Sequence, residues 1–275
     1  MTLTVAKHSS AYWRVTFNNP PINLYDQQLV EHLQALTEQL ENDDEVNIVV
    51  FDSADPNYFI AHIDLTGIDK FSLEPGPTGL APWPDLVSRW QNASFVTVGL
   101  LRGRARGVGS EFLQALDIRF ASREKAVLSQ IEVGTGVIPG GGGLERLPLL
   151  IGRARALEVI IGADDFDADT AALYGWVNRA IPDAEIEGFV ERFAMRVASF
   201  DRRLIATVKD IVNQRVERPT NEQIVATQNK FFEIAEWPET QKRLLSLFER
   251  GLQIRGDFEM NLGAMLGPQS LGSTN

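Results

Sequence analysis

The chain contains no cysteine and only three histidines, His8, His32 and His62. Without cysteine there are no disulfides and no thiolate metal sites. The histidines do not fall into a metal-binding spacing such as HExxH, so we predict no metal site. The absence of thiols fits a reducing compartment, and we expect a cytoplasmic protein.

Long uncharged apolar runs are also absent, so we expect no transmembrane helix and no membrane partner. Residues 1–10 lack the apolar core of a signal peptide. Basic residues are scarce, since 26 Lys and Arg stand against 37 Asp and Glu, for a formal net charge of −11. A chain this acidic is a poor non-specific ligand for nucleic acid, which we do not expect as a partner. Neither GxGxxG nor GxxxxGK[ST] occurs, so nucleotide binding of those kinds is not predicted.

What the chain does contain is a regular alternation of short strand patterns and helical patterns up to about residue 182, followed by helical patterns to about residue 266. This order predicts an α/β core in residues 1–200 and an α-helical C-terminal region in residues 201–275. Asp26 is expected to cap a helix whose leucines at 29, 33, 36 and 40 share one face. Further predictions are strands at 12–17, 47–51, 95–101, 118–121, 126–129 and 178–182, a short helix near Leu65, and a helix capped by Asp169.

Residues 73–84 hold four prolines and two glycines. This composition predicts an irregular segment. Such a segment is either a mobile lid over a ligand or a plain surface insertion, and the sequence favours neither.

Two glutamates stand beside glycine-rich turns. Glu111 follows Gly107-Val-Gly109, where a strand pattern turns into a helix pattern, and Glu132 precedes the glycine run Gly140–Gly143. Exposed N–H groups at the first turn of a helix, such as that of Val108, can hold a developing oxyanion. Two carboxyl groups in different environments can divide acid and base duties. Together they indicate proton transfer beside a carbonyl group, although Glu111 alone would also suit the helix dipole.

Two further groups of residues have alternative explanations. The loop at Ala61–Asp64 could offer a second backbone N–H, and its His62 is either a functional imidazole or, as we prefer, a structural hydrogen-bonding residue. Arg102, Arg104 and Arg106 alternate along an extended segment and so share a face. They would suit a phosphate, but pairing with the excess of acidic residues is slightly favoured.

Four segments in this order resemble the enoyl-CoA hydratase/isomerase family, the crotonase superfamily. The family motif NGxAxGGGxELAxxCD is similar to Arg102-Gly-Arg-Ala-Arg-Gly-Val-Gly-Ser-Glu-Phe-Leu-Gln-Ala-Leu-Asp117. The motif QPExxxGxxPGxGG is similar to Gln130-Ile-Glu-Val-Gly-Thr-Gly-Val-Ile-Pro-Gly-Gly-Gly-Gly143. Gly152-Arg-Ala154 and Ala171-Ala-Leu-Tyr-Gly-Trp-Val-Asn178 resemble two later motifs. The resemblance covers roughly residues 12–210.

The resemblance implies a spiral of ββα units with an α-helical C-terminal region that serves trimerisation and active-site cover. It implies an acyl-CoA substrate with no cofactor beyond its coenzyme A, and a homotrimer or a dimer of trimers. Its implied acid/base pair is Glu111 and Glu132, and its implied oxyanion hole is the N–H groups of Ile63 and Val108. The residues expected to contact the substrate are Ala61, His62, Asp64, Arg104 and Gly107.

Some positions depart from the family pattern. His62 replaces a glycine and Ile63 a small residue in the first oxyanion loop, Val108 replaces the middle glycine of a triple, and Gly256–Gly263 replaces the usual closing motif. Hydration of a 2-enoyl-CoA is the leading prediction because both carboxylates are retained. An isomerase, a specialised acyl-CoA lyase and a catalytically silent acyl-CoA-binding protein remain as alternatives.

Overall fold

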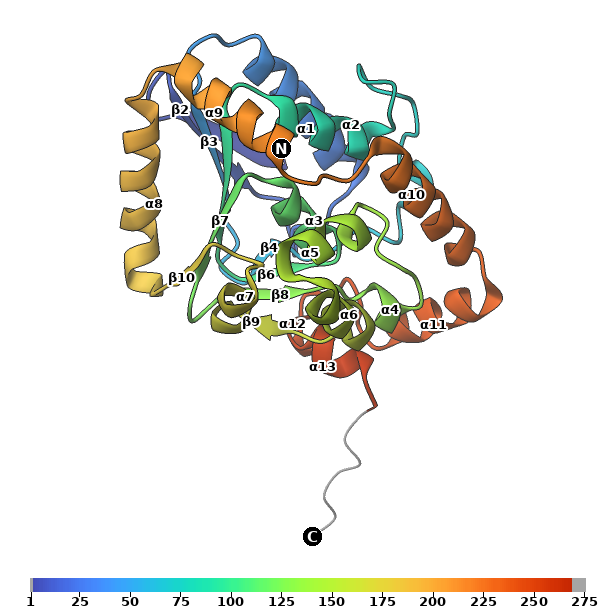
Figure 1. The fold of residues 1–275 in the computed structure, drawn as a ribbon. Helices are drawn as coiled ribbons and strands as arrows, with labels where there is room; N and C mark the ends of the chain where they lie inside the picture. The colour runs from blue at the N-terminus through green and yellow to red at the C-terminus, as the bar shows by residue number, and fades with distance from the viewer. Residues whose placement is uncertain (1, 269–275) are drawn as a thin grey trace.

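Two β-sheets organise the computed structural model, which describes residues 2–268 (Figure 1). The larger sheet has the order β1 (Leu3–Lys7), β2 (Tyr12–Phe17), β3 (Ile48–Ser53), β5 (Val96–Leu101), β7 (Ile118–Ser122) and β10 (Arg179–Ile181). The smaller sheet has the order β4 (Tyr58–Ile60), β6 (Arg104–Arg106), β8 (Val127–Ser129) and β9 (Phe166–Asp167). The pairs β1–β2 and β8–β9 are antiparallel, and all other neighbours are parallel.

The chain alternates between the two sheets as it advances. β3 is followed by β4, β5 by β6 and β7 by β8, and each pair leads into a helix: α2 (Pro82–Asn92), α3 (Val108–Ala115) and α4 (Glu132–Thr135) respectively. This is the spiral of ββα units that the resemblance implies. The other helices of this part are α1 (Gln27–Glu41), α5 (Gly143–Ile151), α6 (Arg153–Gly162), α7 (Ala168–Tyr174) and α8 (Asp183–Ala198).

Local sequence explains the best-defined elements. The run Ile48–Phe51 in β3 is fully buried, as expected for a central strand of a parallel sheet covered on both faces. Asp26 caps α1 by accepting a hydrogen bond from Leu29 N at 2.8 Å, and the predicted leucine face of α1 is buried. One face of the large sheet packs on an aromatic core that includes Phe51 and Phe112, whose rings lie 5.3 Å apart.

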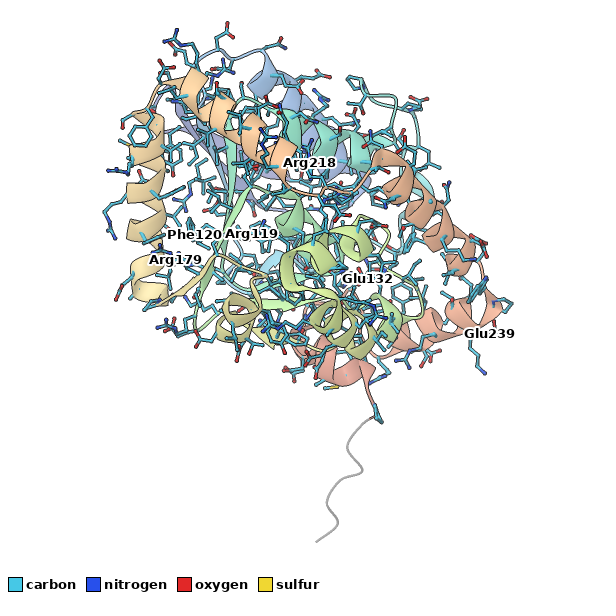
Figure 2. All side chains as sticks on the ribbon, in the orientation of Figure 1. Arg119, Phe120, Glu132, Arg179, Arg218 and Glu239 are labelled. Carbon is cyan, nitrogen blue, oxygen red and sulfur yellow. The ribbon has the colours of Figure 1, made fainter. Side chains whose placement is uncertain are left out.

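The opposite face of the large sheet is covered by α8. Phe120 of β7 packs edge-on against Phe189 of α8 at 5.0 Å. Figure 2 shows Phe120 and Arg179 beside this helix, well separated from Glu132. The large sheet therefore separates a structural layer from the part of the molecule that contains the glutamates.

The C-terminal region consists of α9 (Arg202–Arg215), α10 (Asn221–Ala235), α11 (Pro238–Glu249), α12 (Asp257–Met260) and α13 (Leu262–Leu266). In Figure 1, α10 to α13 lie on the side of the molecule away from α8. They share apolar clusters with the α/β part, since Ile131 packs with Leu252 and Leu266. Within residues 2–268, no helix has the length and apolarity needed to cross a membrane.

Three details differ from the sequence predictions. Residues 82–84 are not irregular but form the first turn of α2, where proline is tolerated because the N–H it lacks would have no intrahelical acceptor. Asp167, not Asp169, caps α7 through Thr170 N at 2.7 Å. The helix expected near Leu65 is a short 3₁₀ turn at Ile68–Lys70. The other predicted strands and helices agree with the structure to within a few residues, whereas β1 and β9 were not predicted.

Candidate active site

A cavity of about 110 Å³ lies among α2, α3, α4 and α10. Glu111, Glu132, Ile63 and Val108 all line it. The structure therefore brings the four residues predicted for catalysis to one place. In Figure 2, Glu132 lies between α5 and the C-terminal helices, inside the body of the molecule.

Gly107 makes the turn from β6 into α3. Its φ of +52° is a conformation that residues with a Cβ rarely adopt. A Cβ there would lie 2.9 Å from Glu132 Oε1, so the glycine also makes room for that carboxyl group. Val108 follows as the first residue of α3, and its N–H therefore has no intrahelical acceptor. This turn thus places a backbone donor and a carboxyl group side by side.

Glu111 lies in the first turn of α3 and is held by the glycine run. Its Oε1 accepts hydrogen bonds from Gly141 N at 2.9 Å and Gly143 N at 2.8 Å. Burial raises the pKa of Glu111 to about 7, although the two N–H groups and the charge of Arg146 act in the opposite direction. The glycines therefore hold an anion, as their sequence permits, and that anion is the protein's own carboxylate.

Glu132 begins the short helix α4 and is also buried. Its nearest polar side chain is Gln130, whose Nε2 lies 3.3 Å and 3.4 Å from the two carboxyl oxygens. Burial and the charge of Glu111 raise the pKa of Glu132 well above its ordinary value. Because two close, buried carboxyl groups resist ionising together, one of them carries a proton near neutral pH.

The loop Ala61–Asp64 is fixed by Tyr25. Tyr25 N donates to His62 O and Asp64 N donates to Tyr25 O, both at 2.9 Å. This pairing places Ile63 opposite Tyr25 in a parallel bridge and leaves the Ile63 N–H outside it. Ile63 and Val108 both line the cavity, and the Ile63 N–H is not used by the pairing with Tyr25.

The His62 ring does not act as a free imidazole. Its Nδ1 lies 2.9 Å from Ile63 O, and its Nε2 lies 2.9 Å from Glu259 Oε1 of α12. Burial alone would raise the pKa of Glu259, but the charge and hydrogen bond of His62 lower it. Both ring nitrogens of His62 are therefore engaged by acceptor groups of the protein. The preferred structural interpretation of His62 is supported.

The other residues predicted to contact substrate divide into two groups. Gly107 and His62 line the cavity, whereas Ala61, Asp64 and Arg104 are not part of its wall. Asp64 Oδ1 accepts from Thr66 N and from Gln253 Nε2, which stabilises the loop. The expectation for Arg104 is not supported, because its Nε donates to the Met260 carbonyl at 2.7 Å.

The arginine stripe is structural. Arg102 Nε pairs with Asp183 at 2.9 Å, and Arg106 Nε pairs with Asp165 at 2.7 Å. Pairing with acidic residues, the slightly favoured interpretation, is therefore confirmed for both. Since Arg106 is fully buried, this face is not open to a phosphate.

Several cavity residues were not predicted from the sequence. Tyr25, Phe71, Trp83 and Phe231 supply aromatic walls, and Trp83 Nε1 donates to Gly141 O at 2.8 Å. Tyr25 stands in no recognisable motif. Trp83 lies in the proline-rich segment, whose possible role as a lid gave the only sequence signal toward it. No group of three or more His, Cys, Asp or Glu within residues 2–268 is arranged to hold a metal ion.

A spiral of ββα units with two buried carboxyl groups on one cavity defines the class of protein, an enzyme with the crotonase fold. The chain belongs to the enoyl-CoA hydratase/isomerase family, whose model matches residues 7–253. An acyl-CoA substrate is consistent with that family.

Individual relatives agree with this assignment. The short-chain-enoyl-CoA hydratase of Clostridium acetobutylicum is 26% identical over 243 residues, covering 88% of this chain and 92% of the relative. The crystal structure of a candidate enoyl-CoA hydratase from Streptomyces avermitilis has a TM-score of 0.91 and 40% identity, covering 97% of this chain and 96% of the other. The structure of Pseudomonas aeruginosa DspI has a TM-score of 0.69 and 28% identity, covering 90% and 96%.

Proposed function

We propose that the protein adds water across the C2–C3 double bond of a 2-enoyl-CoA thioester. The single observation that supports this most strongly is the pair of buried carboxyl groups, Glu111 and Glu132, on one cavity with raised pKa values and unlike hydrogen-bond partners. Hydration needs one group to activate water and another to protonate the α-carbon. Coenzyme A enters as part of the substrate, and no separate cofactor takes part in this proposal.

The two environments suggest which glutamate does what. Two backbone N–H groups favour the ionised form of Glu111, so Glu111 is assigned as the base. Glu132 has only its own backbone N–H and the amide of Gln130 as donors and is raised in pKa by the charge of Glu111, so it is assigned as the acid. In the reaction, Glu111 takes a proton from water while the water oxygen bonds to C3, and the π electrons move toward the thioester oxygen. Glu132 then donates its proton to C2, giving a 3-hydroxyacyl-CoA.

Backbone N–H groups complete the proposed site. Those of Ile63 and Val108 are assigned to the thioester oxygen, where negative charge develops as the enolate forms. A donor that is already aimed at such an oxygen needs no reorganisation during the reaction, and each is typically worth about 10²–10³ in kcat. The His62–Glu259 pair supports this role because it fixes the peptide groups around Ile63.

The test is the loss of enoyl-thioester absorbance when purified protein is mixed with a panel of 2-enoyl-CoAs, beside Glu132→Gln. Loss with the wild type and not with the variant supports hydration, provided that the variant still binds a saturated acyl-CoA. Loss at an unchanged rate in Glu132→Gln would remove Glu132 from the mechanism. No loss with any substrate would reject hydration and leave isomerase, lyase or silent binding roles to be assayed.

A homotrimer, or a dimer of such trimers, is the proposed assembly. Its support in this chain is α9, which has no buried residue and exposes apolar side chains on one stripe. The stripe consists of Leu204, Val208, Ile211 and Val212. Light scattering coupled to size-exclusion chromatography would measure the mass, and a monomer at micromolar concentration would reject the assembly.

A further inference from the structure

The Tyr25 hydroxyl is a buried polar group without a hydrogen-bond partner among residues 2–268. Buried hydroxyl groups are almost always bonded, so such an exception in a native fold calls for a physical explanation. Tyr25 is 2% exposed and lines the active-site cavity. No other residue of the described cavity wall has a buried polar side-chain atom in this state.

The phenol is held firmly in place. The backbone of Tyr25 pairs with the oxyanion loop on both sides of Ile63. Its ring stacks on Phe71 at 6.2 Å and meets the edge of Trp83 at 5.5 Å. A side chain fixed at the backbone and on two sides of its ring cannot easily turn to find another partner. The hydroxyl oxygen is closed to solvent, so an acyl group that enters the cavity beside Tyr25 is the remaining source of an acceptor.

Its chemistry is that of a neutral donor. Burial, followed by the charges of Glu111 and Asp26, raises the pKa of Tyr25 above its ordinary value. The phenol thus stays protonated at any physiological pH and can donate a hydrogen bond. Neighbouring donors are already used, since Trp83 Nε1 bonds Gly141 O and Thr135 Oγ1 bonds Glu132 O.

Much of the remaining cavity wall is apolar, including Val30, Leu65, Ile68 and Phe231, although Ser72 and Gln228 also line it. An all-hydrocarbon acyl chain would pack against the apolar wall but leave the Tyr25 hydroxyl without an acceptor. An acyl chain with one correctly placed oxygen would pack against the wall and also accept the hydrogen bond from Tyr25.

We propose that Tyr25 selects 2-enoyl thioesters whose acyl group carries an oxygen atom beyond the double bond. A hydroxyl, keto or ether oxygen there would accept the hydrogen bond from Tyr25 Oη. This inference rests on the proposed function and names the acyl class for the same site. A site built to bond a substrate oxygen discriminates against the analogue without it, because its buried donor is then left unpaired.

The experiment compares pairs of 2-enoyl-CoAs of equal chain length that differ in one oxygen substituent at C4, C5 or C6. The variant is Tyr25→Phe, and the matched control is Tyr58→Phe. Tyr58 is also a buried tyrosine with an unpaired hydroxyl, but it does not line the cavity. The wild type should prefer the best oxygenated substrate by about tenfold in kcat/KM, the effect of one neutral hydrogen bond. Tyr25→Phe should bring that ratio to about one, and Tyr58→Phe should leave it unchanged.

Two results would overturn the inference. One is a wild type with no preference for oxygen at any position. The other is a Tyr25→Phe variant in which both members of every pair slow equally, which would place the phenol at the reacting carbons. Thermal unfolding of both variants establishes that they are folded.

A binding arm separates this inference from the proposed function. Saturated acyl-CoA pairs with and without the oxygen are titrated while tryptophan fluorescence is followed, because Trp83 lies in the cavity wall. Selective binding that depends on Tyr25, without turnover of any enoyl-CoA, would reject hydration and keep the inference. Hydration of enoyl-CoAs with no preference for the oxygen in binding or rate would support the proposed function and reject this inference.

Discussion

Glu111 and Glu259 are both buried glutamates, yet their pKa values move in opposite directions. Glu111 is bonded only by neutral backbone N–H groups, and its pKa rises to about 7. Glu259 Oε1 lies 2.9 Å from His62 Nε2, and its pKa falls. Burial raises the pKa of both glutamates, so the contact with His62 makes the difference. The fold therefore keeps Glu259 ionised and leaves Glu111 able to exchange a proton near neutral pH.

The largest effect is expected when the exchangeable carboxyl group is removed. Glu111→Gln should lower kcat/KM for hydration by about 10²–10⁴, the usual share of a general base. The amide oxygen of glutamine can still accept from Gly141 and Gly143, so folding should be retained. Stopped-flow absorbance with an enoyl-CoA measures the rate. A loss of less than about tenfold would contradict the role assigned to Glu111.

Removing the contact between His62 and Glu259 should instead lower the stability of the folded protein. Glu259→Ala strips the buried His62 of its partner, which typically costs about 3–5 kcal/mol of the free energy of unfolding. Chemical denaturation measures this loss. The matched control is Glu239→Ala on the outer side of α11 (Figure 2), which should change stability by less than about 0.5 kcal/mol. Equal effects of the two changes would show that the His62–Glu259 pair is not a special contact.

The comparison also predicts opposite responses to pH. Since the pKa of Glu111 is raised from 4.5 to about 7, the folded state holds its proton longer, and stability falls as pH rises between those values. Glu111→Gln removes this titration. Between pH 4.5 and about 7, the free energy of unfolding of the variant should therefore rise relative to that of the wild type by on the order of 3 kcal/mol. The lowered pKa of Glu259 has the reverse sign, and its contribution is lost as pH falls below about 4.5. Denaturation curves at several pH values measure both slopes.

Activity should follow the same group. Because Glu111 acts as a base, kcat/KM should rise with pH and level off above about 7. An activity that is already maximal at pH 5 would not fit this assignment.

The smallest effect is expected at an exposed ion pair. Arg123 Nε lies 3.1 Å from Asp169 Oδ1, but both side chains are largely in solvent. Arg123→Ala should change the free energy of unfolding by less than about 1 kcal/mol, because solvent weakens such pairs. A larger loss, measured by the same denaturation assay, would mean that charge pairing matters irrespective of burial.

Sequence alone could predict the parts of the site that are built locally. A glycine at a positive φ, the helix that starts after it and the carboxyl group in its first turn are all consequences of Gly107–Glu111. The same holds for Glu132 and its glycine run, and both carboxyl groups do line one cavity. The alternation of strands and helices likewise predicted the α/β core.

Long-range contacts were beyond such prediction. Nothing around His62 in the sequence indicates that its partner is 197 residues away. Nothing around Arg104 indicates that its guanidinium will donate a hydrogen bond to a backbone carbonyl of α12. Tyr25 carries no motif, because its role depends on which side chains surround it after folding. Spacing describes local geometry, whereas these three positions depend on how distant segments pack.

The contact between His62 and Glu259 also has a consequence for biosynthesis. A ribosome synthesises His62 197 residues before Glu259, so the nascent polypeptide carries the loop around His62 without its partner until α12 has been made. Chains released before residue 259 should be inactive even if their glutamates 111 and 132 are present.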